Sequence, residues 1–122
     1  MTTLPMLPCF LNGDYTDLAN AKISVMDRGF IFGDGVYEVV PVYGSRLFRF
    51  NEHMARLERS LAQVRIANPM ARVEWQALAE RLIADYAQSV GITPQSSDQL
   101  VYIQVTRGVA MRDHVMPSDV SP

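Results

Sequence analysis

The sequence has few of the residues that build disulfides, metal centres and polyanion-binding surfaces. Cys9 is the only cysteine, so no internal disulfide can form, and no Cys/His cluster suggests a metal site. Eleven basic and thirteen acidic residues give a formal net charge of -2, which offers no basic surface for nucleic acid or an anionic membrane. No apolar run approaches the roughly 18 residues of a membrane-spanning helix, and residues 1–10 do not resemble a signal peptide. We therefore expect a cytoplasmic protein without a metal, nucleic-acid or membrane partner.

Lysine is also scarce. Ten of the eleven basic residues are arginine, and Lys22 is the only lysine. Any mechanism that needs a lysine amine therefore has a single candidate in this chain. The sequence also contains no P-loop, no GxGxxG dinucleotide motif and no GxSxG nucleophile elbow.

What is present is the composition of one globular domain. The 122 residues are 48% hydrophobic and 20% charged, and a chain of this length buries roughly two-thirds of its unfolded surface. Asn12-Gly13 favours a tight hairpin turn, because such turns need positive φ at both central positions. We expect strands at residues 9–11, 14–16, 23–25, 36–43, 46–50 and 100–107, with an irregular glycine-rich connection at 27–35. Pro41 must lie at an edge or a bulge of the sheet, since it has no N–H to donate.

Two helices are expected before the last strand. Asn51 is a suitable N-cap for the first helix, and the second runs from about residue 73 to 90 and ends at Gly91. Apolar residues at helical spacing define the buried faces; they are Met54, Leu57, Leu61 and Val64 in the first helix, and Trp75, Leu78, Leu82 and Tyr86 in the second. This order of elements predicts an α+β fold, a two-layer domain in which an antiparallel sheet carries both helices on one face.

The first expected helix carries one pair of candidate functional residues. His53 and Arg56 are three residues apart and therefore share one side of the helix. The ordinary interpretation is a solvated helix face, and the functional alternative is anion binding by Arg56.

A second group of candidates lies on and after the strands. Arg112 and His114 follow the last strand in a loop, where the planar donors of arginine fit a carboxylate; the alternative is an ordinary polar loop. Tyr37 and Tyr102 lie on strands, where tyrosine is most often half-buried structure. Glu38 must point to the face opposite Tyr37.

Three blocks of the sequence, taken together, resemble the fold type IV pyridoxal-phosphate enzymes, which include D-amino acid aminotransferase, branched-chain aminotransferase and aminodeoxychorismate lyase. The first block is the glycine-rich stretch 27–39, and the second is Asn51-Glu52-His53 with Arg56-Leu57. The third block, 102–108 followed by Arg112 and His114, resembles the D-amino acid aminotransferase branch in particular. The blocks occur in the order of the family and cover residues from about 10 to 117.

The resemblance implies roles for individual residues. Arg56 matches the arginine that binds the phosphate of the cofactor, pyridoxal 5'-phosphate. Tyr37, Arg112 and His114 match the residues that hold the α-carboxylate of a D-amino acid, the last two reaching in from the partner subunit of a homodimer. Tyr102 matches a tyrosine near the substrate.

The implied function is the transfer of an amino group between a D-amino acid and a 2-oxo acid. In the family, the lysine that forms a Schiff base with the cofactor belongs to a larger C-terminal domain, and Lys22 does not match it. Residues 1–117 therefore resemble the small N-terminal domain, with 118–122 beginning a linker, and we expect these 122 residues alone to be inactive. The alternatives are a branched-chain aminotransferase or an aminodeoxychorismate lyase of the same fold, and a stand-alone binding or dimerisation domain.

Overall fold

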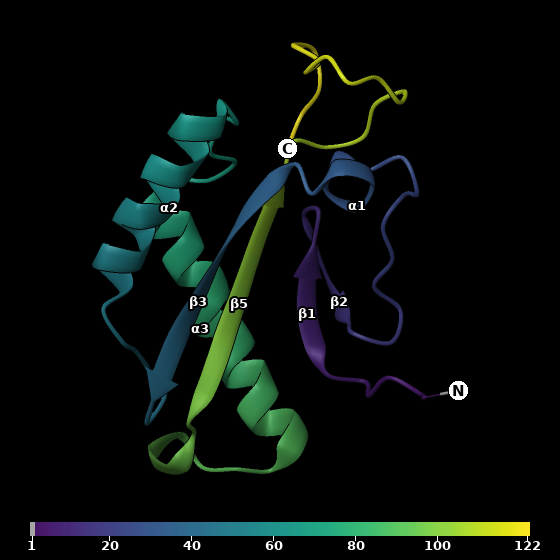
Figure 1. Cartoon of the computed structure of the whole chain (residues 1–122). Helices are drawn as coiled ribbons and strands as arrows, with labels where there is room; N and C mark the ends of the chain where they lie inside the picture. Colours follow the sequence, from purple (N-terminus) through teal and green to yellow (C-terminus); the bar gives the residue numbers. More distant parts are fainter. Residues whose placement is uncertain (1) are drawn as a thin grey trace.

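The computed structural model describes residues 2–122, in which strands come first, two long helices follow and one strand ends the fold (Figure 1). The strands are β1 (Pro8–Leu11), β2 (Asp14–Asp17), β3 (Gly35–Tyr43), β4 (Arg46–Leu47) and β5 (Gln99–Thr106). The helices are α1 (Arg28–Phe32), α2 (Phe50–Val64) and α3 (Arg72–Val90), with a short 3-10 helix at Pro94–Ser96. No helix in this part of the chain combines the length and the apolar character needed to cross a membrane.

A three-stranded antiparallel sheet, in the order β4-β3-β5, forms the centre of the fold. The β3–β5 pairing begins with Gly35 opposite Thr106 and ends with Val42 opposite Gln99. Side chains alternate between the two faces of a strand, so one face of this sheet presents buried valine and isoleucine while the other presents exposed tyrosine.

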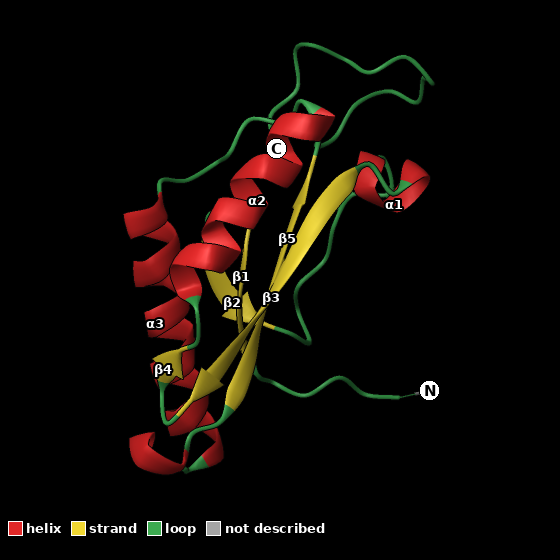
Figure 2. Cartoon of the chain, turned by 60° about the vertical axis from the view of Figure 1, so that its left-hand side comes forward, coloured by secondary structure: helices red, strands yellow, loops and turns green. Residues whose placement is uncertain are grey.

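Both long helices cover the apolar face of this sheet (Figure 2). Each helix contributes an apolar stripe to a single core that also contains the inward side chains of β3 and β5. The core members are Met54, Leu57 and Leu61 from α2, Ile66 from the turn after it, Trp75, Ala79 and Ile83 from α3, Val40 and Val42 from β3, and Val101, Ile103 and Val105 from β5. The predicted α+β fold, with two helices on one face of an antiparallel sheet, is confirmed.

The predicted Asn-Gly hairpin is also confirmed, but it forms a sheet of its own. Asn12 and Gly13 both have positive φ, at 49° and 93°, and connect β1 to β2. β1 pairs only with β2 among the described strands, so the sheet layer consists of two separate sheets rather than the single one expected.

Two expected strands differ in the structure. Residues 23–25 form no strand, and Ile23 and Val25 are exposed, because nothing pairs with this connecting segment. The strand expected at 46–50 is limited to Arg46–Leu47, because Arg49 takes a left-handed conformation (φ 52°) that turns the chain into α2.

The helix ends are partly as expected. α2 begins at Phe50, after Arg49, and has no side-chain cap, so the prediction of Asn51 as N-cap was wrong. α3 ends at Gly91 in the left-handed conformation, as predicted. Within α3, Leu82 and Tyr86 are only half-buried, and Ile83 and Ala87 are buried in their place. α3 therefore presents two apolar stripes, one to the core and one to the groove between the two sheets.

The glycine-rich connection contains a short helix that the sequence did not indicate. The Asp27 carboxylate accepts the Gly29 N–H at 2.8 Å and caps α1, and Gly33 ends the helix at φ 66°. A side chain on Gly29 or Gly35 would collide with Val105 or Thr106 of β5. Glycine therefore allows α1 and the start of β3 to pack directly on β5.

Pro41 lies in β3, the middle strand of the sheet, but just beyond the residues that pair with β4, so its amide position lies at a local edge of the β3–β4 pairing. Its carbonyl accepts the Phe48 N–H, so this side of β3 faces β4 rather than β5. β4 pairs only with Val42 and Tyr43, and the ladder needs no N–H from Pro41.

Candidate functional site

The first part of the candidate site is a carboxylate among the valines of β3. The alternation of β3 places Glu38 on the same face as Val36 and Val40, toward α2, and opposite Tyr37, as predicted. The side chain of Glu38 is 3% exposed. A charge this well buried must be paired and hydrogen-bonded to be tolerated.

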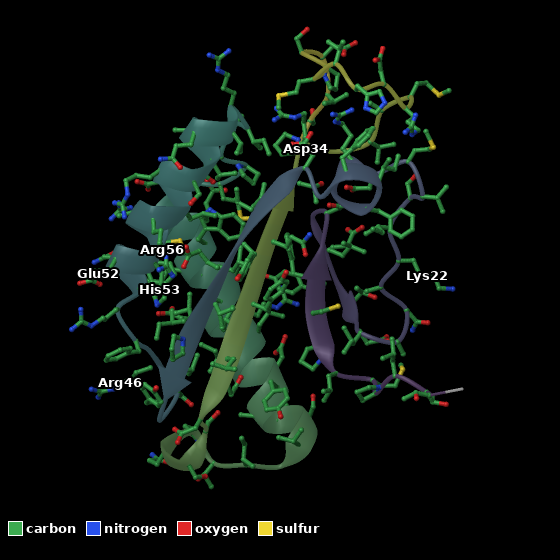
Figure 3. All side chains as sticks on the ribbon, viewed as in Figure 1. Lys22, Asp34, Arg46, Glu52, His53 and Arg56 are labelled. Atoms are coloured by element: carbon green, nitrogen blue, oxygen red, sulfur yellow. The ribbon has the colours of Figure 1, made fainter. Side chains whose placement is uncertain are left out.

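α2 supplies both partners of this carboxylate. Arg56 Nε donates to Glu38 Oε2 at 2.7 Å, and Arg56 Nη2 donates to Oε1 at 2.8 Å. His53 Nδ1 lies 2.8 Å from the same Oε1 and must be the donor, because an ionised carboxylate only accepts. Figure 3, in the same view as Figure 1, shows His53 and Arg56 on the side of α2 toward β3.

The bidentate contact orients Arg56 without using all its donors. A guanidinium has five N–H groups in a fixed plane, and the two bonds to Glu38 leave three of them unused by this carboxylate. The Arg56 side chain is 60% exposed. The unused donors are therefore accessible to an anion from outside the chain.

The charges of this cluster support one another. The hydrogen bonds from Arg56 hold the pKa of Glu38 below its usual range, against the opposing effect of burial, and the His53 contact adds to the lowering. The same pairing raises the pKa of Arg56. Both groups are charged at neutral pH.

The second part of the site is the open face of the sheet. The rings of Tyr37 and Tyr102 stack with their centroids 5.9 Å apart, and the Tyr102 hydroxyl donates to Gln104 Oε1 at 2.9 Å. The two tyrosines are 63% and 60% exposed. They form a flat aromatic surface beside a small hollow of about 140 Å³ that Gly33 and Gly35 also line.

The third part is the loop after β5, which brings Arg112 and His114 to α1. The Arg112 guanidinium lies 5.4 Å from the centroid of the Phe32 ring, and the His114 ring lies 5.5 Å from the same ring. Both residues are exposed. Two donors suited to a carboxylate are thus held against one aromatic side chain.

A buried charge network holds this loop in place. Asp34 Oδ2 accepts from Arg28 Nε and from Arg107 Nε, each at 2.8 Å. Arg28 Nη1 then donates to the main-chain carbonyl of Asp113, between the two candidate residues, at 2.8 Å. Arg107 donates to the carbonyls of Val64 and Arg65 at the end of α2. One carboxylate therefore ties the loop to α1, β5 and α2.

Asp34 remains ionised in this network. Burial opposes its ionisation, but the hydrogen bonds from Arg107 and Arg28 outweigh this effect and hold the pKa of the carboxyl below its usual range. Arg28 and Arg107 are 4% and 6% exposed, so all three charges depend on one another.

The predicted site residues fall into three groups. Tyr37 lies with Tyr102, Arg112 lies with His114, and Arg56 lies at α2 with Glu38. No hydrogen bond, ring contact or cation–π contact joins Arg112 or His114 to Tyr37 within residues 2–122. Lys22 is exposed in the segment between β2 and α1, on the side of the molecule away from Arg56 (Figure 3).

Sequence reasoning missed the groups that orient these residues. The role of Glu38 could have been predicted, because Glu38 shares one face of its strand with Val36, Val40 and Val42. A carboxylate on such an apolar face is buried and therefore requires a cationic partner. The Asp34 network had no comparable pattern, since its members are distant in the sequence.

Comparison with known proteins defines the class of this domain. The model of the family described as amino-transferase class IV matches residues 35–121, and the chain belongs to this family. Among the relatives, the chain is 41% identical over 110 residues to a D-alanine aminotransferase of Listeria monocytogenes serotype 4b (strain F2365). That match covers 89% of this chain and 35% of the relative, so the chain spans about a third of the length of the enzyme it matches.

Solved structures of the family share the fold. A branched-chain amino acid aminotransferase of Escherichia coli superposes with a TM-score of 0.70 at 22% identity, over 90% of this chain and 35% of that chain. A 4-amino-4-deoxychorismate lyase of Pseudomonas aeruginosa superposes with a TM-score of 0.62 at 29% identity, over 84% and 33%. Similarity at these levels identifies the fold but not the substrate, which must be inferred from the site residues.

Proposed function

We propose that this chain forms part of a pyridoxal-phosphate-dependent aminotransferase that moves an amino group between a D-amino acid and a 2-oxo acid. The observation that carries the proposal is the loop that holds Arg112 and His114 together over Phe32, fixed by the bond from Arg28 to the Asp113 carbonyl. Similarity to a D-alanine aminotransferase supports the choice of a D-amino acid.

Arg56 fits the phosphate of the cofactor. Glu38 fixes its guanidinium through Nε and Nη2, and the remaining N–H groups stay exposed. Arginine held in this way binds phosphate through charge-assisted hydrogen bonds. When bound, pyridoxal phosphate supplies an electron sink for reactions at the α-carbon of an amino acid.

Tyr37, Arg112 and His114 fit the α-carboxylate of the substrate, and Tyr102 stacks beside Tyr37 to shape the same face. Because no ring or cation–π contact joins Tyr37 to Arg112 or His114 within one chain, we infer a homodimer in which the loop of one subunit reaches the site of the other. Exposed apolar side chains on the open face, including Leu100 at 70% and Tyr102 at 60%, support a face that another part of the assembly covers.

Lys22 does not fit the catalytic lysine, because its exposed segment is remote from Arg56. We infer that residues 1–117 act as a small domain, with 118–122 beginning a linker, and that the lysine comes from a further domain. The 122 residues alone would then not transaminate.

The decisive experiment measures initial rates of the protein at the length of its relatives, with 2-oxoglutarate as acceptor. D-alanine should be preferred over L-alanine and L-leucine as donor. Preference for L-leucine would instead support a branched-chain aminotransferase, and release of pyruvate from aminodeoxychorismate without an acceptor would support the lyase. Turnover by the 122-residue chain that disappears in Lys22→Arg would contradict the placement of the lysine elsewhere.

A further inference from the structure

One aromatic side chain, Phe32, contacts both of the loop residues assigned to the substrate carboxylate. Its ring centroid lies 5.4 Å from the guanidinium carbon of Arg112 and 5.5 Å from the centroid of the His114 ring. Phe32 is the last residue of α1 and is half-buried, whereas Arg112 and His114 are both exposed. An apolar side chain therefore supports two polar side chains at the surface.

The Phe32 ring is itself held from within α1. Arg28 lies one helical turn earlier, and its guanidinium carbon is 4.7 Å from the centroid of the ring. This guanidinium is fixed in turn, because Nε donates to Asp34 Oδ2 and Nη1 donates to the Asp113 carbonyl, each at 2.8 Å. The Arg28 side chain is 5% exposed. One buried arginine thus fixes the main chain between the two donors and also contacts the ring on which they lie.

Long exposed side chains benefit from such support. A free arginine side chain samples many rotamers, and binding a ligand must order it at an entropic cost. The face of an aromatic ring attracts a cation electrostatically, so Phe32 favours those rotamers of Arg112 that lie against it. His114 contacts the same ring. The ring therefore limits the freedom of both donors before a substrate arrives.

We propose that Phe32 is a positioning residue for the substrate, which pre-orients Arg112 and His114 of its own subunit to donate to one α-carboxylate. The inference rests on the proposed function, which assigns the carboxylate to these two residues. Phe32 has no polar side-chain atom and acts through the two donors rather than on the carboxylate. An aliphatic side chain would fill the same space but would lack the negative face of the ring.

The test is steady-state kinetics of the protein at the length of its relatives, with D-alanine as donor and 2-oxoglutarate as acceptor. Phe32→Leu should raise KM for D-alanine about fivefold, the scale of a lost cation–π contact. kcat should change less, because carboxylate binding is present in ground and transition states alike. The dissociation constant of the cofactor, from titration of the apoenzyme, should stay unchanged. Phe32→Tyr keeps the aromatic face and should keep the KM of the unmodified enzyme.

Phe30→Leu is the matched control, because it makes the same replacement on the same helix. Phe30 is 68% exposed, and within residues 2–122 no ring or cation–π contact joins it to Arg112 or His114. It should leave KM unchanged. An unchanged KM in Phe32→Leu, an equal rise in Phe30→Leu, or an equal rise in Phe32→Tyr would overturn the proposal. If Phe32→Leu fails to fold, Phe32→Met removes the ring while keeping more of its volume, and the same outcomes apply.

A second comparison asks whether Phe32 acts through the two donors. In a background that carries Arg112→Ala and His114→Ala, Phe32→Leu should leave kcat/KM for D-alanine unchanged, since the groups that it positions are gone. A further loss of about fivefold in this background would show that the ring acts by another route, and would overturn the proposal.

Arg112→Ala alone distinguishes this proposal from the proposed function. If KM rises in Arg112→Ala but not in Phe32→Leu, only the role of Phe32 is overturned. An unchanged KM in Arg112→Ala would contradict the assignment of the carboxylate to this loop and would overturn both.

Discussion

Glu38 and Asp34 are both carboxylates with little exposure, and each accepts hydrogen bonds from two basic side chains, yet they orient different kinds of group. Glu38 holds the exposed side chain of Arg56 and leaves part of its guanidinium accessible. Asp34 holds two buried arginines, and one of these fixes the main chain of a loop. The same kind of charge pairing thus orients the Arg56 side chain in one region and fixes the main chain at Asp113 in the other.

Removal of the Asp34 carboxylate should have the largest effect. Asp34→Ala leaves Arg28 and Arg107 buried without their counter-charge, which typically costs about 3–5 kcal/mol of unfolding free energy. Urea denaturation measures the change. The control is Asp85→Ala, because the Arg81–Asp85 pair spans 3.6 Å with both side chains half exposed, and such pairs contribute about 0–1 kcal/mol. Equal losses in the two variants would contradict the network.

Removal of the Glu38 charge should cost less. In Glu38→Gln the cation that loses its partner, Arg56, is already exposed and can be hydrated by water, so we expect less than half the loss found for Asp34→Ala. The same denaturation experiment measures it. A Glu38→Gln loss as large as that of Asp34→Ala would show that the exposure of the cation does not distinguish the two regions.

Loss of Arg56 should weaken cofactor binding, in addition to the stability lost because the buried Glu38 keeps only His53 as a side-chain donor. Arg56→Ala in the protein at full length should weaken pyridoxal phosphate binding by roughly tenfold or more, since a hydrogen bond to a charged group is lost. Titration of the apoenzyme gives the dissociation constant. Arg59→Ala, at an exposed position on the same helix, is the control and should bind normally. Unchanged affinity in Arg56→Ala would remove this residue from the phosphate site.

Loss of Arg112 should weaken substrate binding and leave cofactor binding unchanged. Arg112→Ala should raise KM for D-alanine by roughly tenfold while kcat changes less, because carboxylate binding is present in ground and transition states alike. Steady-state kinetics measures both constants, and cofactor affinity should stay unchanged. A loss confined to kcat would be inconsistent with a carboxylate-binding role.

The dependence of stability on pH should be the smallest effect and should report both carboxylates. Because the folded-state pKa values of Asp34 and Glu38 lie below their ordinary values of 3.8 and 4.5, the stability they add is fully present above those values. It is lost as the pH falls through the lower folded-state pKa values. Denaturation between pH 6 and 2 should therefore show a decline that begins near pH 4.5 and is shallower in Asp34→Asn. An equally steep decline in that variant would show that Asp34 does not contribute.

Local patterns in the sequence predicted the elements and missed the contacts between them. The Asn12-Gly13 turn, the alternation of β5 and the end of α3 at Gly91 depend on neighbouring residues, and all three were predicted. α1 depends on the close packing of Gly29 against Thr106 of β5, which no local pattern encodes. No local pattern indicated the left-handed Arg49 that precedes α2 either. Among the site residues, Glu38 had a local pattern, whereas the partners of Asp34 meet only after β5 and α2 have packed.

Trp75 is the only tryptophan of the chain, and it gives the domain a single fluorescent reporter. The indole is 6% exposed in the core, and its Nε1 donates to Asn68 Oδ1 at 3.0 Å. The same ring also lines the groove between the sheets. Its emission should therefore shift to longer wavelength when the core opens to water, whereas rearrangement confined to the exposed Arg112–His114 loop should leave it unchanged. One spectroscopic signal can thus separate loss of the fold from loss of the substrate loop in every variant described above.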